Sequence, residues 1–373
     1  MMVLLLILIV PYFIIYILFF AVLMARPMAG NNPNITDAAG RERTVLNLPL
    51  LSVIIPFRNE AASLPAIIED LALQEWPRSL TEIILIDDGS TDNSFAEAAM
   101  LAARIDNCRV IRNEGSGKKQ AIAFAIGITS GDIIVTTDAD CRLNHGWLTG
   151  IARVYNETGA EVITGAVYPL PNPGILNQLL HLEMMAIHSV SWATSVINHP
   201  VMASGANLAF TREVSAGYID FIRPSISSGD DMFLLHHAKR DRRKIVFNYS
   251  EGAEVLTLPP TGLLRLIKQR IRWSSKGFKY RDSDTILLGA VTSLTNIFLI
   301  SFLVLSAFIP GFFRIAAAAW FLKSVPDFLI LLRAASVLNR RRLLLWFLPL
   351  HLIYPVYVLL VSFAGIIYRP PWK

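Results

Sequence analysis

Charged side chains are scarce in this chain. Asp, Glu, Lys and Arg make up 17% of its 373 residues, whereas soluble domains average about 25%. Hydrophobic residues reach 53%, and the mean hydropathy is +0.47. This composition indicates a membrane protein. The net charge of +5 is small and scattered, which argues against a nucleic-acid partner and suits contact with anionic lipid or a phosphorylated substrate.

Cysteine is also rare. The chain has two, Cys108 and Cys141, and they do not show the spacing of metal ligands. A disulfide scaffold is therefore excluded, and we expect both thiols to be buried as small apolar groups.

No charged residue interrupts residues 1–25. At 1.5 Å per residue this apolar run can span a bilayer of roughly 30 Å. A cleaved signal peptide is the rival interpretation, but the run has no basic residue before it, exceeds the usual apolar length and lacks a small-x-small cleavage site. We therefore expect a membrane anchor. Basic residues follow the run, which predicts an external N-terminus and a cytoplasmic central region.

Two further apolar runs lie at 286–310 and 343–367, with a weaker one at 312–332 between them. Charged residues interrupt the middle run, so we expect it to pack against protein or to lie partly in the interface. The basic residues at 333–342 should face the cytoplasm. The C-terminus is then external, unless the middle run does not cross.

The sequence predicts five parts. These are an N-terminal transmembrane helix at 1–25, a linker at 26–49, a catalytic α/β domain at 50–258, an amphipathic interfacial segment at 259–284 and a C-terminal transmembrane region of two or three helices at 285–373. The linker is polar and contains Asn34-Ile35-Thr36. This is formally a glycosylation acceptor, which we interpret as a chance match on the cytoplasmic side.

Short apolar strands alternate with helices through the central region. Strands are predicted at 51–56, 82–86, 109–112, 132–137 and 161–167, and helices at 61–73, 92–104 and 118–128. This alternation is typical of βαβ units around a parallel sheet that is covered on both faces. Ligands of such sheets bind beyond the carboxyl ends of the strands. The residues that follow each strand are therefore candidates for a functional site.

Acidic residues gather at these strand ends. The first strand is followed by Phe57-Arg58-Asn59-Glu60, the second by Asp87-Asp88-Gly89-Ser90-Thr91-Asp92 and the fourth by Asp138-Ala139-Asp140. Carboxylates at one sheet edge repel one another, and a divalent cation on a diphosphate would relieve the repulsion. Mg²⁺ or Mn²⁺ is the expected ion, because both prefer oxygen ligands.

Each cluster also has a plainer interpretation. The Asp-Gly-Ser-Thr-Asp stretch is a good turn followed by a helix N-cap, and an Asp-x-Asp pair is common by chance. Gly115-Ser116-Gly117-Lys118 resembles a phosphate loop, but Arg112 stands where the Walker pattern requires glycine. Lys118 remains a candidate phosphate contact at the start of a helix.

Several motifs occur in a fixed order across more than half of the chain. They are Pro56-Phe57-Arg58-Asn59-Glu60, Asp87-Asp88-Gly89-Ser90, Lys118, Asp138-Ala139-Asp140, Ser204-Gly205-Ala206-Asn207, Gly229-Asp230-Asp231 and Gln269-Arg270-Ile271-Arg272-Trp273. In this order they resemble the glycosyltransferase family 2 enzymes, which are inverting transferases with a GT-A fold. The last motif resembles the QxxRW element of their integral-membrane branch. The resemblance implies a Rossmann-like nucleotide-sugar domain flanked by transmembrane helices.

The resemblance also implies residue roles. Donor binding falls to Pro56, Arg58, Glu60, Asp87, Asp88, Lys118 and Asp138. The cation would be held by Asp140 with Asp138, and Asp231 would be the general base beside Asp230, where the family usually has Glu-Asp. The residues over the diphosphate and the acceptor would be Gly205, Asn207, Gln269, Arg270, Arg272 and Trp273.

Inverting glycosyl transfer requires three parts, which are a base, a metal ion and a cationic side chain. Inverting transfer needs a carboxylate that deprotonates the acceptor hydroxyl as it attacks the anomeric carbon. The departing diphosphate gains negative charge, which a metal ion and a cationic side chain stabilise. Asp231, the Asp-x-Asp pair and Arg272 can supply these parts.

Two segments have the composition of interfacial helices. Residues 263–280 alternate apolar and basic side chains and include Trp273, and residues 176–196 are apolar but contain His181, Glu183 and His188. Such segments lie at a membrane surface with their basic face toward headgroups. We interpret these histidines, together with His236 and His237, as structural residues.

The sequence supports a membrane-bound hexosyltransferase that uses a nucleotide sugar, with UDP favoured, and a lipid or glycan acceptor at the cytoplasmic face. Processive polysaccharide synthesis is the alternative, since the QxxRW element is common to both. A catalytically inactive membrane scaffold is the alternative from another class, but a scaffold needs none of these carboxylates.

Overall fold

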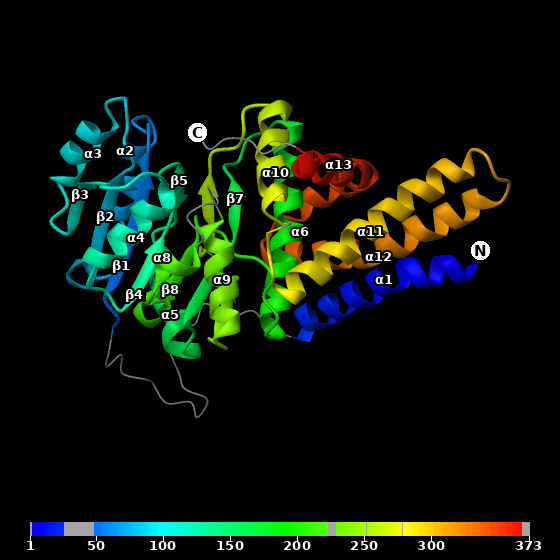
Figure 1. The fold of residues 1–373 in the computed structure, drawn as a ribbon, viewed down its shortest axis with the longest axis horizontal. Coiled ribbons are helices and arrows are strands. Elements are labelled where there is room, and N and C mark those ends of the chain that lie inside the picture. The colour runs from blue at the N-terminus through cyan, green and yellow to red at the C-terminus, as the bar shows by residue number, and fades with distance from the viewer. Residues whose placement is uncertain (1, 26–47, 223–228, 251, 278, 368–373) are drawn as a thin grey trace.

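The computed structural model describes residues 2–25, 48–222, 229–250, 252–277 and 279–367, with backbone alone for 2–8. The predicted linker and its Asn34-Ile35-Thr36 match fall almost entirely outside these residues, as does the end of the C-terminal region. Figure 1 shows an α/β domain joined on one side to a bundle of long helices.

Most strands of the described chain belong to a seven-stranded sheet with the order β3-β2-β1-β4-β8-β6-β9. Its strands are β1 (Leu51–Phe57), β2 (Thr81–Asp87), β3 (Cys108–Arg112), β4 (Ile133–Thr136), β6 (Val162–Gly165), β8 (Leu208–Thr211) and β9 (Ile245–Asn248). Strands β1 to β4 pair in parallel, whereas β8 is antiparallel to both of its neighbours. The ends of β1 and β2 lie side by side, because Phe57 pairs with Asp87.

A second sheet of three strands, with the order β5-β10-β7, lies beside the first. It consists of β5 (Cys141–Leu143), β7 (Val167–Pro169) and β10 (Val255–Thr257). The single strand predicted at 161–167 is wrong in this detail. It breaks at Ala166, so that β6 stays in the large sheet and β7 joins the small one.

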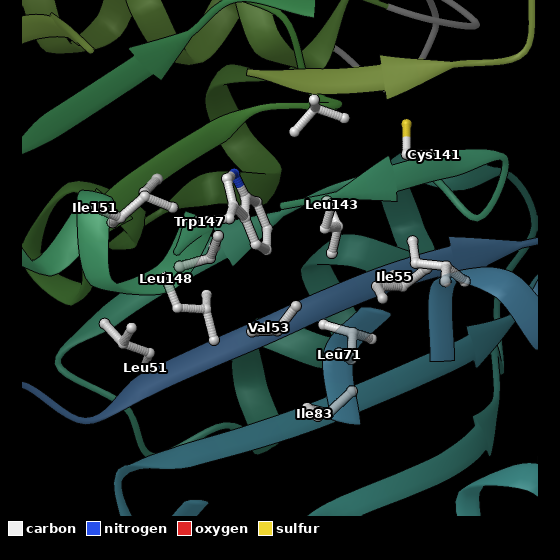
Figure 2. Close-up of a cluster of buried hydrophobic side chains, with 14 of the residues drawn as sticks. Leu51, Val53, Ile55, Leu71, Ile83, Cys141, Leu143, Trp147, Leu148 and Ile151 are labelled. Carbon is white, nitrogen blue, oxygen red and sulfur yellow. The ribbon is translucent and has the colours of Figure 1, made fainter. Parts of the chain in front are cut away.

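Helices cover both faces of the large sheet. Helices α2 (Leu64–Ala72), α3 (Ser94–Ala102) and α5 (Trp147–Thr158) supply one hydrophobic core, and α4 (Lys118–Ile128), α8 (Tyr218–Phe221) and α9 (Asp230–Arg240) supply the other. The strand periodicity explains the division. Val53 and Ile55 of β1 point into the first core, and Ile54 between them joins the second. Figure 2 shows the first core around Trp147.

The predicted strands and helices of this domain are present; the helix at 118–128 has the predicted bounds, and the ends of the other two helices differ by one to three residues. The short elements η1 (Arg78–Leu80) and α7 (Arg212–Ser215) complete it. Both cysteines are free. Cys141 is buried, as expected, whereas Cys108 is only half-buried at the edge strand β3.

The helix bundle contains α1 (Met2–Ala25), α11 (Ser283–Ser306), α12 (Phe312–Val337) and α13 (Phe347–Ile367), the last preceded by η2 (Arg341–Trp346). In the described residues, α11, α12 and the η2–α13 segment are long and apolar enough to cross a membrane. The weak middle run is thus a continuous helix. Helix α1 packs along α12, so the two ends of the chain share one bundle (Figure 1).

Helices α6 (Ile175–Val196) and α10 (Leu263–Gly277) connect the domain to the bundle. Helix α6 packs against β7 and β9 on one side and against α1 and α12 on the other, and α10 packs along α13. Both segments that the sequence suggested as interfacial are therefore helices at the junction of domain and bundle. His188 has a structural role there, because its Nε2 accepts a hydrogen bond from the Val167 amide at 3.0 Å.

Candidate active site

The loop after β2 joins the start of α4 through Asp88. The Oδ1 atom of this buried carboxylate accepts hydrogen bonds from Asn113 Nδ2 at 2.8 Å and from the Gly117 amide at 2.7 Å. The neighbouring Asp87 accepts the Ser90 amide at 2.9 Å and closes its own turn. Part of the turn interpretation is therefore correct. The same bonds fix the loop that ends at Lys118, the first residue of α4.

Lys118 lies among the carboxylates of Asp138, Asp230 and Asp231, and these groups together are called the charged cluster. The Lys118 ammonium group forms an ion pair with Asp138, which follows β4. Burial by itself would lower the pKa of Lys118, but the carboxylates of Asp138, Asp230 and Asp231 outweigh it and raise that pKa. Lys118 therefore stays protonated among carboxylates from two loops that are far apart in the sequence.

Carboxylates crowd together around Asp140. Burial raises the pKa of this carboxyl group to about 6, and the charges of Asp138 and Glu60 add to the effect while Lys118 opposes it. Glu60 is held in place because its amide donates to Ser94 Oγ at 2.7 Å and its Oε2 accepts from Ser63. The first and fourth strand ends therefore meet here, as the sequence predicted.

Asp231 lies in the first turn of α9. Its Oδ1 accepts the Met232 amide at 2.8 Å, and its Oδ2 accepts the Gly205 amide at 3.2 Å. Burial and the adjacent Asp230 raise the pKa of the Asp231 carboxyl group, which favours its ability to take up a proton. A methyl group at Gly205 would lie 3.8 Å from Lys118 Nζ and 3.7 Å from Asp230 Oδ2, so this loop sits directly against the charged cluster.

One face of α10 supplies positive charge to the same cluster. Arg272 and Lys276 are four residues apart and thus neighbours on the helix surface. Burial lowers the pKa of Arg272, whereas the charges of Asp138 and Asp231 oppose the shift. Burial also lowers the pKa of Lys276, and there Asp231 gives the largest opposing effect. Arg272 is therefore brought to the carboxylates that the sequence assigned to donor and base.

Arg270 is turned toward the helix bundle. Its guanidinium donates to Glu183 Oε2 on α6 at 2.6 Å, both side chains are buried, and Tyr357 of α13 donates to Glu183 Oε1 at 3.2 Å. The guanidinium also stacks over the Trp273 ring, with 4.2 Å to its centroid. Gln269 accepts a bond from Arg270 at 3.3 Å. Arg270 thus ties α10 to α6 next to α13, while Arg272 reaches the charged cluster.

Asn207 is part of the domain core. Its amide donates to the carbonyl oxygens of Ala166 at 2.9 Å and Ala253 at 2.8 Å, and its Oδ1 accepts the Trp147 indole at 3.0 Å. Gly165 must lack a side chain, because a Cβ atom there would lie 2.3 Å from Asn207. Pro56 lies near the end of β1, and Arg58 is exposed just beyond it.

Lys276 and Glu183 were not singled out as site residues from sequence. Helical periodicity could have found Lys276, because it follows Arg272 by one turn. Glu183 had one signal, a lone acidic residue in an apolar helix, but its pairing with Arg270 depends on the packing of α6 against α10.

The carboxylates suit a divalent cation that is shared with the donor. In the described residues, no group of three or more His, Cys, Asp or Glu side chains could hold a metal ion alone. Mg²⁺ is usually bound through one or two carboxylates together with substrate phosphates and water. Asp138 and Asp140 offer that pair, and a bound cation would oppose the burial and the repulsion that together raise the pKa of Asp140.

Comparison with known proteins agrees with this geometry. The model of the family "Glycosyl transferase family group 2" matches residues 133–362, more than half of the chain, and that of "Glycosyl transferase family 2" matches residues 52–192. The chain belongs to the family 2 glycosyltransferases. Its fold is similar to that of the mannosyltransferase PcManGT from Pyrobaculum calidifontis, solved with GDP-Man and Mn²⁺, at a TM-score of 0.56 and 17% identity over 96% of this chain and 94% of that one.

Curated relatives of this glycosyltransferase include membrane enzymes. Hyaluronan synthase from Streptococcus pyogenes is 25% identical over 66% of this chain and 62% of its own length. The undecaprenyl-phosphate 4-deoxy-4-formamido-L-arabinose transferase of Pseudomonas paraeruginosa is 40% identical over 26% of this chain and 29% of its own length. The chain therefore spans less than two thirds of either relative.

Replacing Asp140 by Asn tests the cation site of this glycosyltransferase. The change keeps the shape of the side chain but removes the charge. Donor affinity in the presence of Mn²⁺ should fall by at least about tenfold, as measured by calorimetry, and affinity in EDTA should change little. Asp106→Asn, at an exposed turn residue, is the matched control. An unchanged Mn²⁺ dependence would exclude Asp140 as a ligand.

Replacing Asp231 by Asn tests its assignment as the general base. Transfer to the acceptor should fall by about 10²–10⁴-fold, because the amide cannot take up the proton of the hydroxyl group. Donor affinity should stay within a few-fold of the wild type. Single-turnover kinetics separate the two quantities, and normal turnover would refute the assignment.

Lys276 should set the pH range in which Asp231 works. Its positive charge lowers the pKa of that carboxyl group, so Lys276→Met should raise the pKa further. Since the base acts only when deprotonated, the acidic limb of the kcat/KM profile should move to higher pH. Lys268→Met, on the exposed part of the same helix, should leave the limb in place. A shift toward lower pH in Lys276→Met would contradict the geometry.

Proposed function

We propose that the protein is an inverting glycosyltransferase that moves a sugar from a nucleotide sugar to a lipid or lipid-linked acceptor at the cytoplasmic membrane face. One observation carries the proposal. Helix α10 brings Arg272 to the carboxylates of the catalytic domain, while Arg270, two residues earlier, is paired with Glu183 of α6 beside the membrane-helix bundle. An active site that adjoins both the catalytic domain and the membrane helices suits a soluble donor and a membrane-embedded acceptor.

The residues divide the reaction between them. Asp231 accepts the proton of the acceptor hydroxyl as its oxygen bonds to the anomeric carbon, and the bond from that carbon to the diphosphate oxygen breaks with inversion. The nucleoside diphosphate leaves with the electron pair. Lys118 and Arg272, both close to the carboxylates, lie where they can stabilise that charge. A divalent cation on Asp138 and Asp140, when bound, would further neutralise the diphosphate.

The donor-binding roles follow from the same placement. Asp87 and Asp88 close the β2 loop beside Glu60 and Lys118, and we assign this loop with Pro56 and Arg58 to the nucleotide, with UDP as the expected nucleotide. We assign Gly205 and Gln269 to the acceptor side, together with Trp273, which is 39% exposed and could offer the acceptor an aromatic surface.

A lipid acceptor is supported by the undecaprenyl-phosphate transferase among the relatives and by the bundle itself. Processive synthesis remains the second candidate, because hyaluronan synthase is also a relative. The basic residues at 333–342 lie at the end of α12 that is next to the catalytic domain. Because basic residues flanking membrane helices favour the cytoplasmic side, they support a cytoplasmic catalytic domain.

The direct test is release of nucleoside diphosphate by the purified full-length protein. A panel of UDP- and GDP-sugars is supplied with Mn²⁺, with and without membrane lipid extract. We expect release from one donor that rises at least about tenfold with lipid and yields a discrete glycolipid. Release that does not depend on lipid and gives a high-molecular-weight product would support processive synthesis and contradict the lipid acceptor.

A further inference from the structure

A cavity of about 350 Å³ lies inside the helix bundle, within the range of ligand sites. Its wall comes from α1, α6, α11, α12 and α13 and is mainly aliphatic and aromatic. Representative lining residues are Ile187, Val190, Leu288, Ile330, Leu331 and Leu350. Those of α11 and α12 fall within 285–293 and 323–331, whereas the connection between these helices, at 307–311, lies at the far end of the bundle (Figure 1). The cavity therefore occupies the half of the bundle next to the catalytic domain.

The charged side chains in the wall are already paired with other protein groups. Lys323 Nζ lies 2.6 Å from Asp327 Oδ2, and Tyr12 donates to Asp327 Oδ1 at 2.6 Å. Glu183 binds Arg270 and Tyr357. A glycan in this space would require hydrogen-bonding partners, whereas these groups are occupied and the rest of the wall is largely apolar. The space suits hydrocarbon.

Two parts of the cavity wall adjoin segments that carry proposed catalytic groups. Glu183 lines it and holds Arg270 of α10, two residues before Arg272. Val201 and Met202 also line it, and the same loop continues to Gly205, whose amide binds Asp231. A molecule in the cavity would thus lie against the loop that continues to Gly205 and against Glu183, the residue that pairs with α10.

Small side chains on α11 leave room at the edge of the cavity. Thr285, Gly289, Thr292 and Ser293 share one helix face and all line the space. Gly289 is exposed, and a Cβ atom built there would meet no atom within 4 Å. Since α11 is a candidate membrane span, this edge gives a hydrocarbon chain a way in from the bilayer.

We propose that this cavity holds the hydrocarbon chain of the lipid acceptor while the polar end of the lipid extends to Asp231. The inference rests on the proposed function and adds the place of the chain. It makes the volume beside Gly289 a determinant of acceptor binding that is separate from donor binding.

The test fills the cavity from Gly289. Gly289→Ala and Gly289→Leu introduce side chains into open space, and both replace glycine by a better helix former, so folding should be preserved. Gly127→Leu is the matched control, because Gly127 is an exposed glycine of α4 with no atom within 4 Å of its Cβ position. Thermal unfolding of each variant checks the fold.

Two readouts are used on full-length protein in phosphatidylcholine nanodiscs. The first is photocrosslinking by a glycerolipid with a diazirine in its acyl chain, mapped by mass spectrometry. We expect crosslinks to Ile187 or Ile330 in the wild type and in Gly127→Leu, and their graded loss in the two Gly289 variants. The second is the KM for lipid extract in the transfer assay, which should rise about tenfold or more in Gly289→Leu with unchanged donor affinity.

The outcomes separate this inference from the proposed function. Crosslinks in the cavity without any sugar transfer would support the cavity as a lipid site and contradict the transferase proposal. Normal transfer in Gly289→Leu, with crosslinks confined to outward residues such as Phe308 and Phe321, would overturn the inference and leave the function intact. A polymer product that Gly289→Leu shortens would assign the cavity to a glycan and also overturn it.

Discussion

The site depends on the repulsion between carboxylates that the fold holds together. Asp138 and Asp140 follow β4, Asp230 and Asp231 begin α9, and the electrostatic coupling of both pairs to Lys118 shows that they share one region. Such a concentration of negative charge is unfavourable unless cations are close. Lys118 from α4 and Arg272 and Lys276 from α10 supply them. Burial and the neighbouring carboxylates nevertheless keep the pKa values of Asp140 and Asp231 raised.

The need for positive charge beside these carboxylates links the active site to the membrane helices, because α10 supplies two of the cations. The cationic face of α10 must stay against the catalytic domain, and α10 itself is held by the buried pair of Arg270 and Glu183 and by packing on α13. A buried pair whose partner is removed leaves an uncompensated charge, which costs several kcal/mol. The pair therefore links the geometry of the active site to the packing of the bundle.

The sequence predicted much of this arrangement because its signals are local. A continuous apolar strand such as β1 and a polar turn such as Asp88-Gly89-Ser90 are visible within a few residues, and the chain order of the motifs placed them at one sheet edge. Arg272, which the motif assigned to the diphosphate and the acceptor, lies close enough to Asp138 and Asp231 to interact with their charges, and its role stays a prediction. The sequence did not indicate which groups the individual side chains of a motif would contact. Arg270 and Arg272 lie in one motif, yet one faces the bundle and the other the charged cluster, and only the packing of α10 decides which.

The same limit applies to Asn207 and to the break at Ala166. The motif placed Asn207 near the acceptor, where its role remains a prediction, whereas its amide bonds to Ala166 and Ala253 result from long-range packing of two sheets. The strand predicted at 161–167 divides for the same reason, since the second sheet receives its end. The cavity beside Gly289 likewise forms only when five helices from the start, the middle and the end of the chain assemble.

The most direct measurement is the structure of the full-length protein in a lipid nanodisc with its nucleotide sugar and Mn²⁺, determined by electron cryomicroscopy. We expect the diphosphate to lie between Lys118 and Arg272, with a metal ion on Asp138 and Asp140 and the anomeric carbon facing Asp231. A donor bound away from this sheet edge, or a diphosphate without contact to α10, would contradict this expectation.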